Sequence, residues 1–253
     1  MIPVYPEPQL IPSLRQLWKL SFGDEDPFLD DFFRTGFSSD RCRCMVVEDQ
    51  AAAALYWFDV TYEDRTYAYI YAVATHPDYR HRGMIRYLLA DTHQLLERRG
   101  YAGALLVPAD PALRQMYAAM GYEDCTGVSQ FVSASLALDV PMHPIDAAEY
   151  GRLRRQFLPE DGVIQEGPTL EFLSTFARFY TGRGFLLCCA PKSQDLLNGI
   201  EFLGDPQAAP GILCSLGYAH GVFQTPGDKL PFAMLYRLQK DCPAPGYFGL
   251  DLS

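Results

Sequence analysis

The sequence predicts a mixed α/β (α+β) protein with two domains, each a mixed twisted sheet flanked by helices. Three observations predict this fold. First, two helix-like segments precede three strand-like ones. Second, the last of these strands leads through a basic turn into a helix, within residues 65–98. Third, the second half of the chain repeats much of that order. We expect the boundary near residue 139, which gives domains at residues 1–139 and 140–253.

The first half begins with two predicted helices. Leucine and aromatic residues at three- and four-residue steps predict a helix over residues 10–22, and Pro27 opens a second, short helix over residues 27–37. Segments rich in valine, tyrosine and alanine then predict three strands, at residues 44–48, 51–62 and 65–74.

A further helix is predicted after Gly83, and its basic last turn ends at Gly100. The apolar segment at residues 101–108 predicts a short strand buried inside a sheet. Asp110 is the expected cap of a last helix, which Gly121 ends.

Residues 122–138 predict one or two strands, and a new domain is expected to begin at the proline-flanked residues 141–146. The elements predicted beyond it are two helices, two strands, a helix-like stretch, a strand and an alternating segment, at residues 145–157, 169–180, 184–190, 198–203, 212–223, 230–238 and 247–253. Their order resembles that of the first half while the motif residues do not, so any internal duplication is either old or only apparent.

The composition of the chain excludes some classes of function. The net charge of −10 argues against a nucleic-acid partner, because phosphate contacts need surplus lysine and arginine. No apolar run is long enough to predict a membrane span, and the amino end lacks a secretory signal, so we expect a cytoplasmic protein. The seven cysteines and five histidines show no ligand spacing, and no metal site is predicted.

Residues 69–86, YIYAVATHPDYRHRGMIR, predict a strand, a turn and a helix start. A helix start offers unpaired backbone N–H groups and a partial positive charge, and Arg80, His81, Arg82 and Arg86 add cations in an otherwise acidic domain. We interpret this as a pyrophosphate site; the alternative is a solvated basic turn. Neither GxxxxGK[ST] nor GxGxxG is present, so a nucleotide kinase or a dehydrogenase is not supported.

The segment ATHPDYRHRGMIRYLL resembles the acetyl-CoA signature of the GNAT acyltransferases, (Arg or Gln)-x-x-Gly-x-(Gly or Ala). It matches at Arg80 and Gly83 and departs at Ile85, where the Eis-like branch also carries a bulky residue. A second segment, MYAAMGY, resembles the family's helix-four motif, Tyr-x-x-x-Gly-(Phe or Tyr). The resemblance covers roughly residues 10–138, and the whole chain resembles tandem proteins in which a degenerate GNAT-like domain follows a working one.

The resemblance implies acetyl-CoA as co-substrate and no metal. It implies that a strand edge pairs with the pantetheine arm and that the loop and helix start hold the pyrophosphate. The residues implied are Val73, Ala74, Thr75, Arg80, His81, Arg82, Gly83, Met84, Ile85 and Arg86. Tyr117 would protonate the departing thiolate, whereas helical spacing alone favours it as a core aromatic.

The general base and the acceptor stay open. Candidate bases are Asp59, Glu63, a water reached through Tyr71, and the terminal carboxylate at Ser253. The acidic residues between positions 24 and 31 would suit a cationic amine such as a polyamine or an aminoglycoside, but an exposed acidic face is the more ordinary interpretation.

The leading hypothesis is therefore an acetyl-CoA-dependent N-acetyltransferase in which a small-molecule or peptide primary amine attacks directly in a ternary complex. Residues 1–139 would be catalytic, and the degenerate residues 140–253 would shape the acceptor cleft or an oligomer. A homo-oligomer is one option. The alternatives are a non-catalytic module that binds acyl-CoA and a tandem-GNAT aminoacyl transferase; the latter's tRNA substrate fits the net charge poorly.

Overall fold

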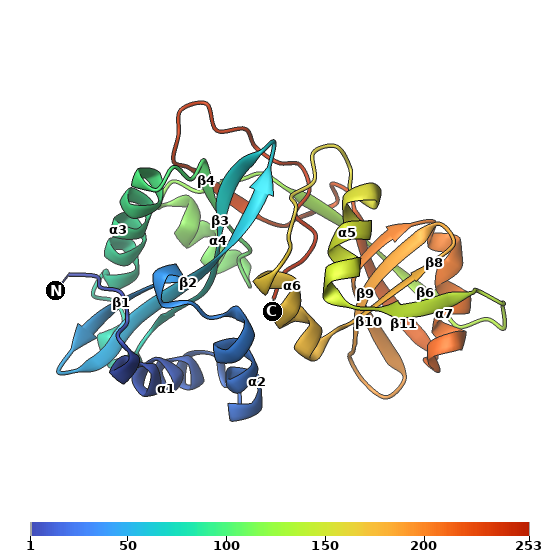
Figure 1. The fold of residues 1–253 in the computed structure, drawn as a ribbon, viewed down its shortest axis with the longest axis horizontal. Helices are drawn as coiled ribbons and strands as arrows, with labels where there is room; N and C mark the ends of the chain where they lie inside the picture. The colour runs from blue at the N-terminus through green and yellow to red at the C-terminus, as the bar shows by residue number, and fades with distance from the viewer. Residues whose placement is uncertain (1, 253) are drawn as a thin grey trace. The chain divides into compact units, whose positions relative to one another are not determined.

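The computed structural model describes residues 2–252, and the chain divides into two units, each with its own sheet (Figure 1). The first unit comprises Met1–Leu106, Asp110–Glu123 and Leu235–Pro243. The second comprises Val107–Ala109, Asp124–Met234 and Ala244–Ser253. Among residues 2–252, no helix is both long and apolar enough to cross a membrane.

The first unit is built on a six-stranded mixed sheet in the order β1-β2-β3-β4-β13-β5. The first three strands form an antiparallel meander, and β4 joins β3 in parallel. Both residues of the turn between β2 and β3 have a positive φ, as a two-residue hairpin requires. The strands are β1 (Cys42–Val47), β2 (Gln50–Tyr62), β3 (Arg65–Thr75), β4 (Gly103–Leu106), β5 (Glu123–Asp124) and β13 (Met234–Arg237).

The helices of the first unit are α1 (Ile11–Phe22), α2 (Asp26–Asp31) with a following π-helical turn (Phe32–Gly36), α3 (Met84–Arg98) and α4 (Pro111–Ala118). Trp18 of α1 packs on Tyr56, with ring centroids 5.4 Å apart, while Arg99 at the end of α3 lies 5.9 Å over the ring of Trp57. Adjacent residues of a strand point to opposite faces. Helices α1 and α3 therefore cover opposite faces of the sheet (Figure 1).

The elements predicted for the first half are confirmed, with small differences at their ends. The strand predicted over residues 101–108 is only four residues long. Asp110 caps α4 as expected, because its Oδ1 accepts the backbone N–H of Leu113 at 2.8 Å.

The second unit is built on a seven-stranded sheet in the order β12-β6-β11-β10-β9-β8-β7. Its strands are β6 (Gly127–Ala134), β7 (Met142–Ile145), β8 (Arg178–Gly182), β9 (Phe185–Pro191), β10 (Leu196–Gly204), β11 (His220–Pro226) and β12 (Leu230–Pro231). Its helices are α5 (Ala147–Phe157), α6 (Pro168–Phe176) and α7 (Ala209–Leu216).

Two predicted helices of the second half were wrong at their carboxyl ends. The helix over residues 169–180 ends at Phe176, since Ala177 is extended and β8 follows. The helix-like stretch over residues 212–223 ends at Leu216, because Gly217 takes a left-handed conformation with φ 78° and β11 begins at His220. The final segment forms no strand of its own within the described residues and makes one bridge, from Tyr247 to Gly162.

The two units share an internal order: two helices, three antiparallel strands, a helix, and a strand parallel to the third. In the first unit this order is α1, α2, β1, β2, β3, α3, β4, and in the second it is α5, α6, β8, β9, β10, α7, β11. The repeat expected from the sequence is therefore present as architecture.

The two halves of the chain exchange strands. Strand β6, from the first half of the chain, pairs with β11 in the second sheet, while β13, from near the end of the chain, lies beside β4 in the first. The structure thus divides the chain differently from a single boundary near residue 139. The physical reason is that the edges of β4 and β11 are each completed by a segment from the other half.

Strand β13 is held in the first unit by ring contacts to α3. Tyr236 stacks on His93 with ring centroids 3.9 Å apart, and His93 Nε2 lies 2.8 Å from the Tyr122 hydroxyl. Burial lowers the pKa of His93 to about 4, so the imidazole is neutral at pH 7.

The stability of the protein should consequently fall on acidification. Between pH 6.5 and about pH 4 the unfolded chain binds a proton at His93 that the folded chain does not, so this contribution is present above pH 6.5 and is lost below it. We expect the free energy of unfolding to drop by about 2 kcal/mol more between pH 7.5 and pH 5 in the wild type than in a His93→Gln variant. Urea titrations at the two pH values measure this; equal drops would contradict it.

A buried ion pair organises the second unit. Arg154 is 1% exposed and Glu201 is fully buried, and the two are joined by hydrogen bonds of 2.7 and 2.8 Å. The Glu201 carboxylate also accepts hydroxyl hydrogen bonds from Tyr150 at 2.6 Å and Tyr247 at 2.9 Å. Arg154 donates further to the carbonyls of Val163 and Phe248, so the network ties the end of the chain to α5 and β10.

Candidate active site

A groove of about 550 Å³ opens in the first unit. Its walls are the end of β3, the loop and start of α3, the inner face of α4, and the last turn of α1. The residues that line it are Ser21, Phe22, Val73, Ala74, Thr75, Tyr79, Arg80, His81, Gly83, Met84, Ile85, Arg86, Leu113, Met116, Tyr117 and Met120.

The β3 wall is an open strand edge. Strand β4 pairs with β3 only from Tyr67 to Tyr69 and ends at Leu106, whereas β3 continues for six more residues, to Thr75. On its other side β3 stays paired with β2, so the edge that lines the groove is not paired with another strand and, apart from the Thr75 carbonyl that Arg80 contacts, can pair with a ligand.

A bulge sharpens this divergence of the strands. Ala54 pairs with Ala74 and Tyr56 with Tyr71, so β3 carries one extra residue there. Ala72 lies in that bulge at φ 48°, a left-handed conformation that costs a residue with a Cβ on the order of 1–3 kcal/mol. The chain maintains this strain where the groove begins.

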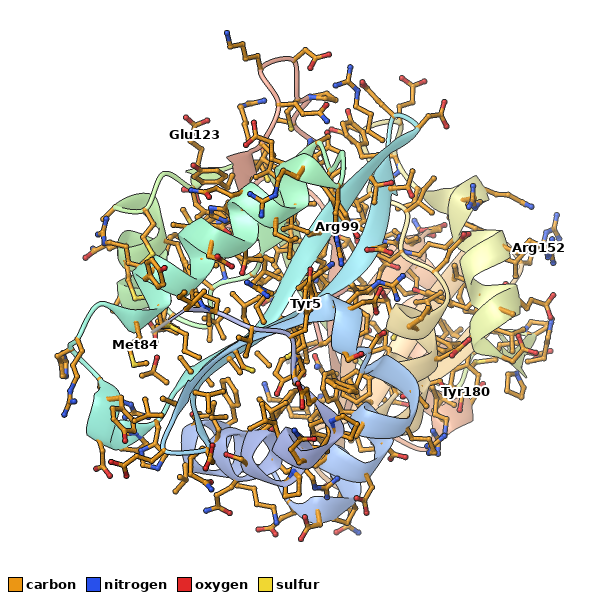
Figure 2. All side chains as sticks on the ribbon, turned by 60° about the vertical axis from the view of Figure 1, so that its left-hand side comes forward. Tyr5, Met84, Arg99, Glu123, Arg152 and Tyr180 are labelled. Carbon is orange, nitrogen blue, oxygen red and sulfur yellow. The ribbon has the colours of Figure 1, made fainter. Side chains whose placement is uncertain are left out.

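The α3 wall is a helix start without a side-chain cap. Gly83 is the N-cap residue at φ 73°, and within residues 2–252 it leaves the start of α3 without a side-chain cap hydrogen bond. Figure 2 labels Met84 at this start and Arg99 just past the other end of the helix. These N–H groups, together with the helix dipole, favour an anion at Met84, Ile85 and Arg86.

Three of the four basic residues predicted at this site line the groove. Arg80, His81 and Arg86 line the groove, and Arg80 also turns back so that its Nε donates to the carbonyl of Thr75 at 3.3 Å. Arg82 does not line it, because its guanidinium lies over the ring of Tyr79, 5.2 Å from the centroid. Of the ten residues predicted to hold the coenzyme, nine line this one groove.

Tyr117 forms part of the α4 wall. It is 7% exposed and packs edge-on against Tyr122 with ring centroids 5.7 Å apart. Burial raises the pKa of its hydroxyl to about 12, so it carries its proton at any ordinary pH. Such a hydroxyl can donate a proton to a strong base formed beside it, and it cannot act as a base itself.

Of the predicted bases, Asp59 and Glu63 do not line the groove. Asp59 pairs across the sheet with Ala68, five residues before Val73 and so roughly 16 Å away along the strand. Its carboxylate accepts hydrogen bonds of 2.6 Å from both Arg41 and Tyr101. Glu63 lies farther still, in the hairpin turn between β2 and β3, and Ser253 lies outside the described residues.

Tyr71 packs into an aromatic cluster rather than the groove. Its ring lies 5.7 Å from that of Trp18 and 6.0 Å from that of Phe32. The acidic residues of the α1–α2 region are also engaged: Asp26 and Asp30 accept from Arg15, Asp31 pairs with Arg34, and Asp24 accepts from Trp18.

Sequence reasoning missed the part of the groove that α1 supplies. Ser21 and Phe22 end an amphipathic helix, and nothing in their spacing separates a groove wall from an exposed last turn. Leu113 and Met116 also line the groove with Tyr117, and helical spacing alone indicates only that α4 has a packing face.

In the second unit, residues 136–140 of the same chain pack against the equivalent helix start. The residues before α7, GDPQAAP at 204–210, include no cation, and the amide of Leu136 donates to the carbonyl of Pro210 at 3.2 Å. Gly211, in the first turn, packs so closely under Val140 that a Cβ there would collide with it. Residues 136–140 therefore pack against the first turn of α7.

Among residues 2–252, no cluster of three or more histidine, cysteine, aspartate or glutamate side chains could hold a metal ion. Residues 7–125 match the family model described as an acetyltransferase (GNAT) domain. This confirms the predicted resemblance to the GNAT superfamily. No curated protein matches the chain.

Solved structures share the fold over nearly the whole chain. A GCN5-related N-acetyltransferase from Kribbella flavida is 16% identical with a TM-score of 0.71, the match covering 93% of this chain and 70% of that one. Eis1 from Mycobacterium abscessus is 11% identical with a TM-score of 0.64, over 94% and 74%. A tandem GNAT protein from the clavulanic acid biosynthesis pathway, solved without AcCoA, is 10% identical with a TM-score of 0.59, over 95% and 98%. The two-sheet architecture is therefore that of a tandem GNAT arrangement.

Proposed function

We propose that this chain, whose residues 7–125 form a GNAT acetyltransferase domain, transfers the acetyl group of acetyl-CoA to a primary amine by direct attack in a ternary complex. The observation that carries the proposal is the groove itself. An open strand edge, an uncapped helix start with cations, and a buried tyrosine face one space of about 550 Å³.

Each wall suits one part of acetyl-CoA. The pantetheine arm carries amide groups that can pair with the open edge at Val73, Ala74 and Thr75 as an added strand would. Its pyrophosphate fits the N–H groups at the start of α3, where Arg80 and Arg86 offset its charge. Gly83, which has no side chain, lets the phosphate approach the backbone.

The chemistry requires little covalent participation from the protein. The amine attacks the thioester carbonyl, and a backbone N–H of the bulged strand polarises the carbonyl oxygen. The carbon–nitrogen bond forms, the carbon–sulfur bond breaks, and Tyr117 gives its proton to the departing thiolate. No enzyme-bound acetyl intermediate is needed.

The second unit is proposed as a degenerate GNAT-like domain without a coenzyme site. The packing of residues 136–140 against the start of α7, and the absence of cations before that helix, support this assignment. The protein would accordingly bind one acetyl-CoA per chain, in the first unit.

Two other functions use the same groove. A module that senses acyl-CoA would bind acetyl-CoA without turnover, and an aminoacyl transferase would need a surface for tRNA that the net charge of −10 disfavours. Calorimetry with acetyl-CoA, followed by a thiol-release assay over a panel of amines, separates the three. We expect one binding site per chain and turnover with an amine; binding without turnover on any acceptor would favour the sensor, and no binding would remove the proposal.

A substitution at Gly83 tests the phosphate site. Gly83→Val should raise the dissociation constant for acetyl-CoA at least tenfold, because the new side chain stands on the groove wall that the pyrophosphate approaches. Gly100→Val is the matched control: Gly100 follows the other end of α3, with a similar φ of 85° and the same open space around a Cβ. Calorimetry should show normal affinity in the control, and equal affinities in the two variants would reject the assignment.

A further inference from the structure

Among residues 2–252, no carboxylate lines the groove, and this bears on the kind of amine that the groove can accept. None of its lining residues is aspartate or glutamate, whereas two of them, Arg80 and Arg86, are arginines. With the pyrophosphate of acetyl-CoA paired to Arg80 and Arg86, a ligand ammonium beside Ser21 or Thr75 would find no carboxylate counter-ion in the groove lining, which is unfavourable for a charge removed from water.

The nearby acidic residues do not remove this difficulty. The carboxylates of Asp26 and Asp30 are engaged by the same guanidinium, that of Arg15, at 2.9 and 2.7 Å, and Lys19 also reaches Asp26 at 2.7 Å. A polycationic acceptor would have to displace these intramolecular pairs. The acidic sequence between positions 24 and 31 is therefore poor evidence for a polyamine or an aminoglycoside.

Two hydroxyl groups of the groove lining could bind a ligand. Ser21 Oγ and Thr75 Oγ1 are buried and, within residues 2–252, have no hydrogen-bond partner, although both residues line the groove. A buried hydroxyl without a partner is unfavourable, and each can turn toward a ligand by rotation about χ1 alone. A hydroxyl oxygen accepts a hydrogen bond from an amine N–H without requiring the amine to be charged.

Part of the groove lining is apolar. Phe22, next to Ser21, is 46% exposed, and Val73, Leu113 and Met116 continue the apolar lining. Burying these apolar side chains against a hydrocarbon or aromatic frame lowers the free energy of binding, whereas placing a second charge of the ligand against them raises it.

We propose that the acceptor is a primary amine on an uncharged apolar frame, held as the neutral amine by hydrogen bonds to Ser21 and Thr75. This rests on the proposed function. Ser21 is then a positioning residue that orients the nitrogen and does not react.

This acceptor also accounts for the absence of a general base from the groove. The lone pair of the neutral nitrogen forms the carbon–nitrogen bond, and the carbon–sulfur electrons leave with sulfur, which takes the proton of Tyr117. The surplus proton on the new amide nitrogen then returns to the Tyr117 oxygen, directly or through water. One acetamide and one thiol are formed, and Tyr117 is restored.

The test compares amines with the full chain at saturating acetyl-CoA. We expect kcat/KM for 2-phenylethylamine and hexylamine to exceed that for spermidine and tobramycin at least a hundredfold. Equal or higher values for the polycations would overturn the inference while leaving the proposed function intact. Turnover of no amine, although calorimetry detects acetyl-CoA binding, would instead remove the proposed function, and the inference with it.

A matched pair of variants tests the role of Ser21. Ser21→Ala should raise KM for 2-phenylethylamine about tenfold, with kcat, the acetyl-CoA dissociation constant and the melting temperature unchanged. Ser39→Ala, at an exposed serine outside the groove, should match the wild type. Thr75→Val should likewise raise KM for 2-phenylethylamine, and Thr66→Val, at an exposed position of the same strand, should not. An unchanged KM in both groove variants would reject the role of the hydroxyls.

Discussion

Replacing Tyr117 with phenylalanine is expected to lower kcat about a hundredfold and to leave the dissociation constant for acetyl-CoA unchanged. The ring still fills the same buried position beside Tyr122, so the groove keeps its shape. What is lost is the proton that the thiolate would take as it leaves. Steady-state kinetics and calorimetry on the purified variant measure the two quantities.

The pH dependence provides an internal check on this role. An acid donates only below its pKa, and burial raises that of Tyr117 to about 12. The wild-type kcat should therefore not decline between pH 8 and pH 10 through loss of this proton. Tyr87→Phe, at an exposed tyrosine of α3, is the control and should be fully active. A Tyr117→Phe enzyme with wild-type kcat would leave the tyrosine a packing residue.

Replacing Glu201 with glutamine should lower the free energy of unfolding by about 3–5 kcal/mol. The substitution preserves the size of the side chain, but it leaves the guanidinium of Arg154 buried without its counter-ion. It also weakens the acceptor for the hydroxyls of Tyr150 and Tyr247, which hold the end of the chain against the second unit. Urea unfolding of the full chain measures the loss.

Glu149→Gln is the matched control for that change. Glu149 pairs with Arg152 at 3.1 Å on the surface of α5, both side chains are largely exposed, and pairs of this kind contribute about 0–1 kcal/mol. We expect the control to lie within that range. A Glu201→Gln variant as stable as the control would mean that the second unit tolerates an unpaired buried arginine.

Most of the first unit could be predicted from sequence because its signals are local. The spacing of Leu14, Leu17 and Trp18 marks the buried face of α1, and Glu63 and Asp64 form the two-residue turn where it was expected. In the second half the apolar residues form nearly continuous runs. A run such as Ile212–Phe223 is compatible with helix or strand, so only Gly217, with its left-handed conformation, divides α7 from β11.

The strand exchange could not be predicted, because pairing between β13 and β4 joins residues more than a hundred positions apart, and no local pattern specifies a partner. The groove was predicted more completely. Residues 73–86 form one continuous strand–loop–helix segment, so their proximity follows from the chain itself. Ser21 and Phe22 reach the same groove only through the packing of α1 on the sheet, which sequence periodicity does not encode.

The exchange of strands has a consequence for how the protein is made. When the first 139 residues have left the ribosome, β4 is present. Strand β13, which covers the edge of β4, lies almost a hundred residues further along the chain and has not yet been synthesised. Until residues 234–237 emerge, the nascent first unit carries an uncovered sheet edge, the kind of surface that attracts other chains and chaperones. Truncation after residue 139 would make that transient state permanent, so the first unit should be expressed with its distant last strand.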